Sequence, residues 1–136
     1  FLGNERVADV LSYGAHGTTF GGNPEACAAG LAVLQEVIDN GLMKRAAEIG
    51  DYLKEGFLGL QKSFPALIKE VRGFGCMLGI ELTREGQPIV DELQNRGFLV
   101  NCTNTSVLRF LPPYIVTREQ CDSVIHELRH IFAHSP

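Results

Sequence analysis

The sequence predicts an α+β fold in which a small, mainly antiparallel sheet is covered by helices on one side. Apolar residues recur every three or four positions along 24–38 and again along 42–64, the period of a helix packed on one face. Between 66 and 110, short apolar runs are separated by glycines, prolines and polar loops, as strands are. A last helical stripe follows. The order helix, helix, strand, strand, helix, strand, strand, helix therefore indicates one layered α+β domain.

The composition is that of an ordinary globular domain. The 136 residues suffice for a buried core, and 45% are hydrophobic and 21% charged. A formal net charge of −4 without a basic stripe argues against nucleic acid as a partner, and no apolar run is long enough to span a membrane. The four cysteines contain no CxxC pair, and Cys27 and Cys121 fall on apolar helix faces. We expect reduced, mostly buried thiols, which favour a cytoplasmic protein.

The first two predicted helices have recognisable ends. Asn23 can cap the first helix, Pro24 suits its first turn, and Asn40-Gly41 favours a left-handed stop. The second helix ends at Phe64-Pro65. Its apolar stripe avoids most of the charged residues, so we expect the stripe to lie in the core. The stripe of the first helix consists of Cys27, Leu31, Leu34 and Ile38, and that of the second of Leu42, Ala46, Ile49, Leu53, Phe57 and Leu60.

Two pairs of strands are expected after these helices. Residues 66–71 and 76–83 are predicted to form a hairpin, with Arg72-Gly73-Phe74-Gly75 as its turn. In this turn Arg72 is either a solvated residue or a structural anchor. A short helix from Pro88 to Gly97 comes next. The second pair is predicted at 98–101 and 107–110, on either side of a polar loop.

A final helix completes the predicted domain. Thr117 and Gln120 have the spacing of a capping box at its start. Its expected buried face consists of Cys121, Val124, Ile125, Leu128, Ile131 and Phe132. His126, His130 and His134 lie four residues apart on the opposite, solvent side, and no further ligand cluster accompanies them, so a metal site is not expected.

The segment His16–Glu25 is the first candidate for a ligand site. Three glycines in six positions let backbone N–H groups approach a bound group, and Thr18 and Thr19 add hydroxyl donors at the same place. The loop runs directly into the start of a helix, where phosphate groups often bind. A tight structural turn before a capped helix is the alternative interpretation. His16 has no nucleophile or orienting carboxylate placed with it, so it is a weak catalytic candidate.

Arg109 is the second candidate. It lies between Leu108 and Phe110 at the end of an apolar strand, just before two prolines that restrict the chain. An arginine held in one direction suits a carboxylate ligand, because its planar guanidinium can donate to both oxygens at once. The alternative is an arginine on the open face of an edge strand.

The motifs His16–Pro24 and Arg72–Leu82 together resemble the C-terminal part of class III aminotransferases. These enzymes use pyridoxal phosphate and have fold type I of the pyridoxal-phosphate-dependent transferases. The resemblance extends over nearly the whole chain. Gly97–Asn101 and Leu108–Pro113 are most similar to the acetylornithine aminotransferase subgroup. The activity implied is transfer of the δ-amino group of N-acetylornithine to 2-oxoglutarate in arginine biosynthesis, by a homodimer.

The resemblance also implies roles for particular residues. Thr19, with Thr18 beside it, corresponds to the threonine that reaches the phosphate of the cofactor in the partner subunit. Arg109 corresponds to the arginine that binds the α-carboxylate of the substrate. Residues 1–23 would be a lead-in and phosphate-binding loop from the large-domain side, and 24–136 the C-terminal small domain with its linking helix.

The family's cofactor-bound lysine is expected upstream of this chain, which has no initiator methionine and whose lysines do not fit that motif. We therefore expect no catalytic residue in the chain and no activity from the chain by itself. Two alternatives remain open. One is another class III enzyme, acting on ornithine, succinylornithine or 4-aminobutyrate, and the other is a non-catalytic dimerisation or folding module.

Overall fold

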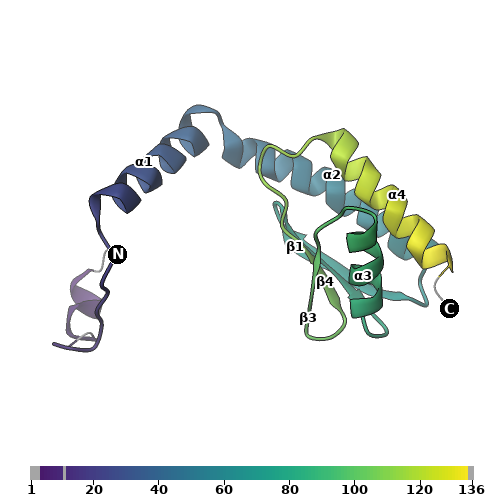
Figure 1. Cartoon of the computed structure of the whole chain (residues 1–136), viewed down its shortest axis with the longest axis horizontal. Helices are drawn as coiled ribbons and strands as arrows, with labels where there is room; N and C mark the ends of the chain where they lie inside the picture. The colour runs from purple at the N-terminus through teal and green to yellow at the C-terminus, as the bar shows by residue number, and fades with distance from the viewer. Residues whose placement is uncertain (1–3, 11, 135–136) are drawn as a thin grey trace. The chain divides into compact units, whose positions relative to one another are not determined.

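A four-stranded antiparallel sheet with the strand order β1-β2-β4-β3 organises the C-terminal part of the chain (Figure 1). Its strands are β1 (Ile68–Phe74), β2 (Met77–Leu82), β3 (Asn101–Thr103) and β4 (Val107–Phe110). All three neighbouring pairs are antiparallel, which confirms the predicted sheet. This computed structural model describes residues 4–10 and 12–134. Residues 1–3 and 11 of the predicted lead-in, and 135–136, lie outside the described residues.

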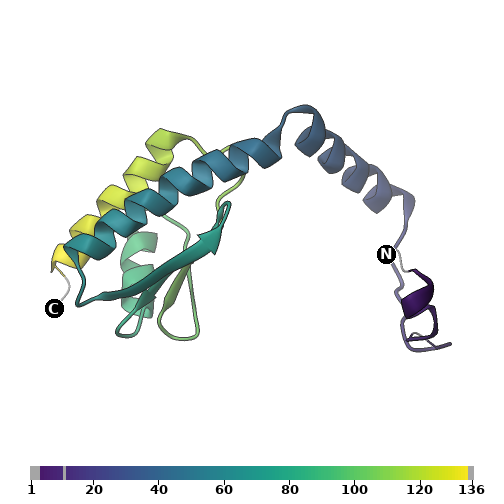
Figure 2. The same ribbon diagram turned by 180° about the vertical axis from the view of Figure 1, so that it is seen from behind.

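Three helices cover one face of the sheet: α2 (Leu42–Ser63), α3 (Gln87–Asn95) and α4 (Arg118–His134). Both ribbon views show α2 and α4 side by side over the strands (Figures 1 and 2). The predicted stripe of α2 supplies Ile49, Leu53, Phe57 and Leu60 to the core, and alternate residues of β2 face them. The ring centroids of Phe57 and Phe110 lie 4.7 Å apart, so α2 and β4 are in direct contact. The α+β layer predicted from the sequence is confirmed.

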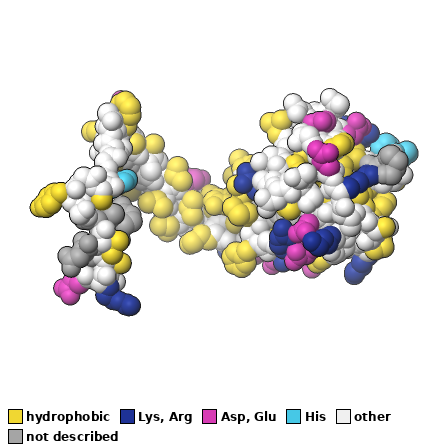
Figure 3. All heavy atoms as spheres, turned by 90° about the horizontal axis from the view of Figure 1, so that it is seen from below, with side chains coloured by type: hydrophobic (Ala, Val, Ile, Leu, Met, Phe, Trp, Pro, Cys, Tyr) yellow, Lys and Arg dark blue, Asp and Glu magenta, His cyan; other side chains and the backbone are white. Residues whose placement is uncertain are grey.

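The chain separates into two compact units, Phe1–Glu36 and Val37–Pro136. The first unit contains a 3-10 helix (Glu5–Val10) and the start of α1 (Pro24–Asp39). No residue of α1 is buried, and Leu31, Leu34 and Ile38 are each more than half exposed. Figure 3 shows hydrophobic side chains on the surface of this part of the chain. The prediction that Cys27 is a buried thiol is wrong, because the stripe that carries it is exposed.

Two predicted strands differ from the structure by three residues at one end. β1 continues through Phe74, so Arg72 and Gly73 belong to a strand and the turn is reduced to Gly75-Cys76. β3 begins at Asn101 rather than at Phe98 and includes two residues of the predicted loop. Asn104 and Thr105 have φ values of 48° and 66°, and this tight left-handed turn leaves Thr103 free to pair with Val107.

The predicted helix signals are confirmed. Gly41 has a φ of 61° between α1 and α2, as a left-handed stop requires. At the start of α4, the backbone N–H of Thr117 donates to Gln120 Oε1, and the N–H of Gln120 donates to Thr117 Oγ1. None of the helices in the described part of the chain has the length and hydropathy to cross a bilayer.

Candidate functional site

Asn23 fixes the loop of the first unit to the start of α1. Its Oδ1 accepts from the backbone N–H of Ala26 at 2.9 Å, and its Nδ2 donates to the carbonyl of Phe20 at 2.6 Å. The backbone N–H of Cys27 is bonded to the carbonyl of Asn23. Asn23 is therefore the predicted N-cap, and it already satisfies part of the helix end. Ligand donors in this region must come mainly from the loop before it.

Thr18 and Thr19 supply such donors. Thr18 Oγ1 accepts from the backbone N–H of Gly21 at 3.0 Å, which leaves its hydroxyl proton available for donation. A Cβ at Gly21 would lie 2.4 Å from Thr18 Cγ2, so a larger residue there would force the Thr18 side chain to move. The Thr19 hydroxyl has no partner among the described residues, and both threonines are exposed. Two hydroxyl donors on an open glycine-rich loop fit a phosphate group in hydrogen-bonding capacity.

A row of four residues crosses the face of the sheet opposite the helices. Arg72 in β1 pairs with Gly79 in β2, Gly79 pairs with Arg109 in β4, and Arg109 pairs with Asn101 in β3. Residues directly opposite each other in antiparallel strands share a face. The buried Leu78 and Ile80 flank Gly79 and point to the other side, into the core. The two arginines therefore lie on the open face, separated by a residue without a side chain.

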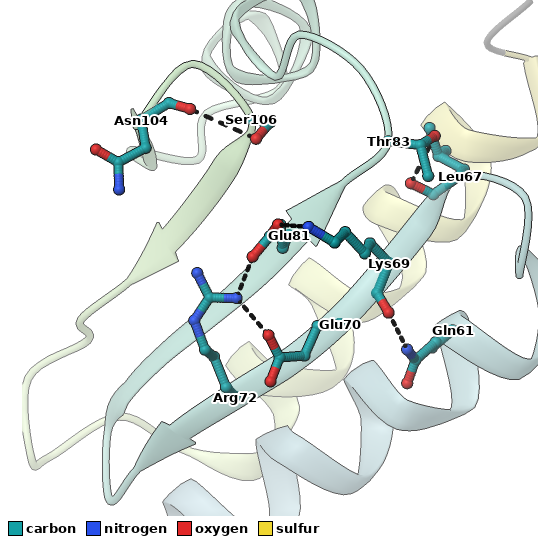
Figure 4. Close-up of polar contacts among 9 residues, drawn as sticks. All are labelled: Gln61, Leu67, Lys69, Glu70, Arg72, Glu81, Thr83, Asn104 and Ser106. Atoms are coloured by element: carbon teal, nitrogen blue, oxygen red, sulfur yellow. Dashed lines mark hydrogen bonds and ion pairs between the residues drawn. The ribbon is translucent and has the colours of Figure 1, made fainter.

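Arg72 is a structural anchor on this face. Its Nη1 bonds Glu81 Oε2 at 2.5 Å and Glu70 Oε2 at 2.7 Å, and Lys69 Nζ bonds the other oxygen of Glu81 (Figure 4). Hydrogen bonds from Lys69 and Arg72 hold the pKa of Glu81 below its ordinary value. Of the two interpretations left open by the sequence, the solvated turn residue is therefore wrong. The charge of Arg72 is compensated by carboxylates.

Arg109 has a different environment. Its Nε donates to Asn101 Oδ1 at 3.1 Å, and it has no carboxylate partner among the described residues. Lys69 and Arg72, the other basic residues of the described strands, are both ion-paired. Arg109 lies on the open face as the alternative interpretation expected, but β4 is an inner strand between β2 and β3, not an edge strand. The exposed, uncompensated guanidinium can bind an anion.

The predicted site residues belong to different units. Thr18 and Thr19 lie in Phe1–Glu36 and Arg109 in Val37–Pro136, and each is described within its own unit. His16, His126, His130 and His134 are exposed, and the described residues contain no group of three or more potential metal ligands. Sequence reasoning missed Asn101. Only the strand register places it beside Arg109, and the sequence offers no signal of that register.

The Lys69–Glu81–Arg72 cluster leads to a pH prediction. A carboxyl group whose pKa is lower in the folded than in the unfolded chain stabilises the fold at pH values above its unfolded pKa. That contribution to stability is lost as the pH falls through the folded pKa. We therefore compare the denaturant midpoints of the wild-type chain and of Glu81→Gln as the pH is lowered. Below roughly pH 4.3, the ordinary glutamate pKa, we expect the midpoint of the wild-type chain to fall more steeply.

Urea unfolding at pH 3 to 7 would measure this effect. Lys69→Met should flatten the profile of the wild-type chain and have no further effect on its slope in the Glu81→Gln background. A midpoint difference between wild type and Glu81→Gln that is the same at pH 3 and pH 6 would contradict the prediction.

Comparison with known proteins adds an independent line of evidence. The family model described as aminotransferase class III matches residues 1–132. Over 131 residues the chain is 47% identical to an acetylornithine aminotransferase of Methanocaldococcus jannaschii, with 94% of this chain and 32% of that protein covered. It is 44% identical to ornithine aminotransferase 2 of Staphylococcus aureus, with 96% and 32% covered. The chain thus spans about a third of the length of these relatives.

A solved structure agrees with these matches. The acetylornithine aminotransferase of Elizabethkingia anophelis superposes with a TM-score of 0.84 at 31% identity, covering 97% of this chain and 34% of that one. Both the sequence family and the fold therefore point to the same group of enzymes. The chain belongs to the class III aminotransferases, a family whose cofactor is pyridoxal phosphate.

Proposed function

We propose that this chain is the C-terminal part of a homodimeric aminotransferase that moves the δ-amino group of N-acetylornithine to 2-oxoglutarate, a step in arginine biosynthesis. Arg109 binds the α-carboxylate of the amino donor. Thr18 and Thr19 donate hydrogen bonds to the phosphate of the cofactor in the partner subunit. Residues 1–23 belong to the large-domain side, and 24–136 form the small domain with its linking helix.

The observation that carries this proposal is the guanidinium of Arg109, which has no carboxylate partner among the described residues. On the same face Arg72 is neutralised by two carboxylates, whereas Arg109 is bonded to a neutral amide. An exposed cation of this kind suits a substrate carboxylate, because both terminal nitrogens can donate to the two oxygens. Held by its α-carboxylate, N-acetylornithine would present the distal amine, because its α-nitrogen is acetylated and no longer basic.

Pyridoxal phosphate, when bound, supplies the electron sink for the transfer of the amino group. The residues of this chain provide binding and orientation. Arg109 limits the directions in which the donor can enter, and the threonine hydroxyls limit the position of the phosphate. Such positioning accelerates a reaction by removing translational and rotational freedom before the chemical step.

Free ornithine is the second candidate donor, because a relative named ornithine aminotransferase 2 is 44% identical to the chain. The two donors differ in the charge of the α-nitrogen. Steady-state rates of the purified full-length protein with N-acetylornithine, ornithine, succinylornithine and 4-aminobutyrate would separate them. We expect the largest kcat/KM for N-acetylornithine. A larger value for ornithine would favour the second candidate, and no transfer to 2-oxoglutarate from any donor would overturn the proposal.

For Thr19→Ala in the full-length protein we expect weaker retention of pyridoxal phosphate. A hydrogen bond to a charged group contributes on the order of 1.5 to 3 kcal/mol, which is roughly ten- to a hundredfold in affinity. The dissociation constant of the cofactor, followed by its absorbance, would measure this loss. Thr19→Ser keeps the hydroxyl and should retain most of the affinity. An unchanged constant for Thr19→Ala would reject the assignment, as would a change only in donor preference.

The 136-residue chain by itself is expected not to transaminate. None of its lysines fits the cofactor-binding motif of the family, and covalent amine chemistry needs such a nucleophile. Mixing the chain with pyridoxal phosphate, N-acetylornithine and 2-oxoglutarate should give no glutamate above the rate without protein. Saturable glutamate formation that depends on the chain would contradict this prediction.

A further inference from the structure

The side chain of Asn101 is the direct cross-strand neighbour of Arg109. Arg109 Nε donates to Asn101 Oδ1 over 3.1 Å, from strands that pair these two residues in register. The guanidinium nitrogen carries a proton and has no lone pair to accept one, so the amide must present its oxygen. The amide nitrogen of Asn101, Nδ2, has no hydrogen-bond partner among the described residues. The contact therefore fixes the orientations of both side chains.

The terminal nitrogens of Arg109 are left available by this contact. Asn101 occupies Nε, and neither Nη1 nor Nη2 has a partner among the described residues. These two nitrogens form one edge of the planar guanidinium group, and that edge can donate two parallel hydrogen bonds to a carboxylate. Asn101 also restricts the rotation of the long, exposed Arg109 side chain. Less conformational entropy is then lost when a ligand binds.

Arg72 shows what a carboxylate does in the same row of residues. Its guanidinium is held by Glu81 and Glu70, so it is both oriented and neutralised. A carboxylate at position 101 would do the same to Arg109 and would compete with an incoming anion. A neutral amide orients the guanidinium and leaves its charge in place.

We propose that Asn101 is a positioning residue for substrate recognition, which orients Arg109 for the donor carboxylate while leaving its charge uncompensated. The inference rests on the proposed role of Arg109. For this role the side chain at position 101 must accept a hydrogen bond and must carry no charge. A purely structural contact would require only the hydrogen bond.

The test compares Asn101→Ala and Asn101→Asp in the full-length protein with two donors. One is N-acetylornithine, and the other is N-acetylputrescine, which is the same molecule without the α-carboxylate. For N-acetylornithine we expect KM to rise about three- to tenfold in Asn101→Ala, the equivalent of one hydrogen bond. Asn101→Asp should raise KM more than Asn101→Ala does. Values of kcat, and the kinetics with N-acetylputrescine, should stay within about twofold.

A binding measurement without turnover complements the kinetics. N-acetylnorvaline has the α-carboxylate of the donor but lacks its distal amine, so its dissociation constant reports carboxylate binding directly. We expect the wild type to bind N-acetylnorvaline most tightly, Asn101→Ala more weakly and Asn101→Asp most weakly. Thr103→Ala is the matched control, because Thr103 lies on the same strand and the same face but pairs with Val107. It should bind N-acetylnorvaline like the wild type.

The outcomes separate the two proposals. If Arg109→Ala impairs only the carboxylate donor while Asn101→Ala leaves both donors unchanged, Arg109 keeps its role and the inference about Asn101 is wrong. If Asn101→Asp has the same KM for N-acetylornithine as the wild type, the contact between Asn101 and Arg109 is only structural. This result would also overturn the inference. If Arg109→Ala affects both donors equally, the proposed function of Arg109 itself fails. In the Arg109→Ala background, Asn101→Ala should add no further loss.

Discussion

Arg109→Ala is expected to lower kcat/KM for N-acetylornithine at least about thirtyfold in the full-length protein. Removing one side of a desolvated charge pair costs about 2 to 5 kcal/mol, and the lower limit of this range corresponds to that factor. Arg109→Lys keeps the charge but loses the second, parallel hydrogen bond to the carboxylate and the Nε contact with Asn101. The kcat/KM of Arg109→Lys for N-acetylornithine should therefore lie between the values of the wild type and of the alanine variant. Initial rates over a range of donor concentrations would give these ratios.

N-acetylputrescine is the control for the specificity of this effect. It has the distal amine but no α-carboxylate, so it makes no contact that the substitutions could remove. We expect both variants to use it within about twofold of the wild-type efficiency. Equal losses with the two donors would mean that Arg109 supports the fold of β4 and does not bind substrate.

The sequence predicted the layered fold because its local signals agree with each other. The stripe of α2, the alternation along β2 and the capping box of α4 all point to the arrangement that is found, and each arises from residues close together in the chain. Agreement between local preference and tertiary packing is typical of natural sequences. The predictions failed where a partner from elsewhere in the chain decides. Cys27 lies on an apolar stripe, but its burial depends on a cover that the pattern cannot report.

The candidate site was predictable in part for the same reason. Arg109 stood out because it interrupts an apolar strand, and Thr18 and Thr19 because they lie among glycines. The compensation of charge was not visible, because it depends on residues eight and nine positions away: Asn101 contacts Arg109, and Glu81 contacts Arg72. The strand register brings these residues together. It places Gly79 and Asn101 opposite Arg109, and a shift of one residue would move their side chains to the other face of the sheet.

The contact behind Arg109 carries the largest predicted effect on stability. Phe57 is fully buried in α2, and its ring lies 4.7 Å from that of Phe110, the residue after Arg109. Truncating a buried phenylalanine to alanine removes apolar contacts and leaves a cavity, which costs about 3 to 5 kcal/mol. We expect Phe57→Ala to reduce the free energy of unfolding of the 136-residue chain by this amount, measured by urea denaturation at neutral pH.

Phe57→Leu provides the matched control, because leucine fills most of the same space and keeps an apolar contact with Phe110. Its loss of stability should be clearly smaller than that of the alanine variant. Leu58→Ala alters a neighbouring position of α2 that is only partly buried and should also cost less. In the full-length protein, Phe57→Ala should also raise KM for N-acetylornithine more than for N-acetylputrescine, because β4 loses the support behind Arg109. A loss below about 1 kcal/mol for Phe57→Ala would contradict the packing between α2 and β4 and, with it, the rigid placement of Arg109 on the open face.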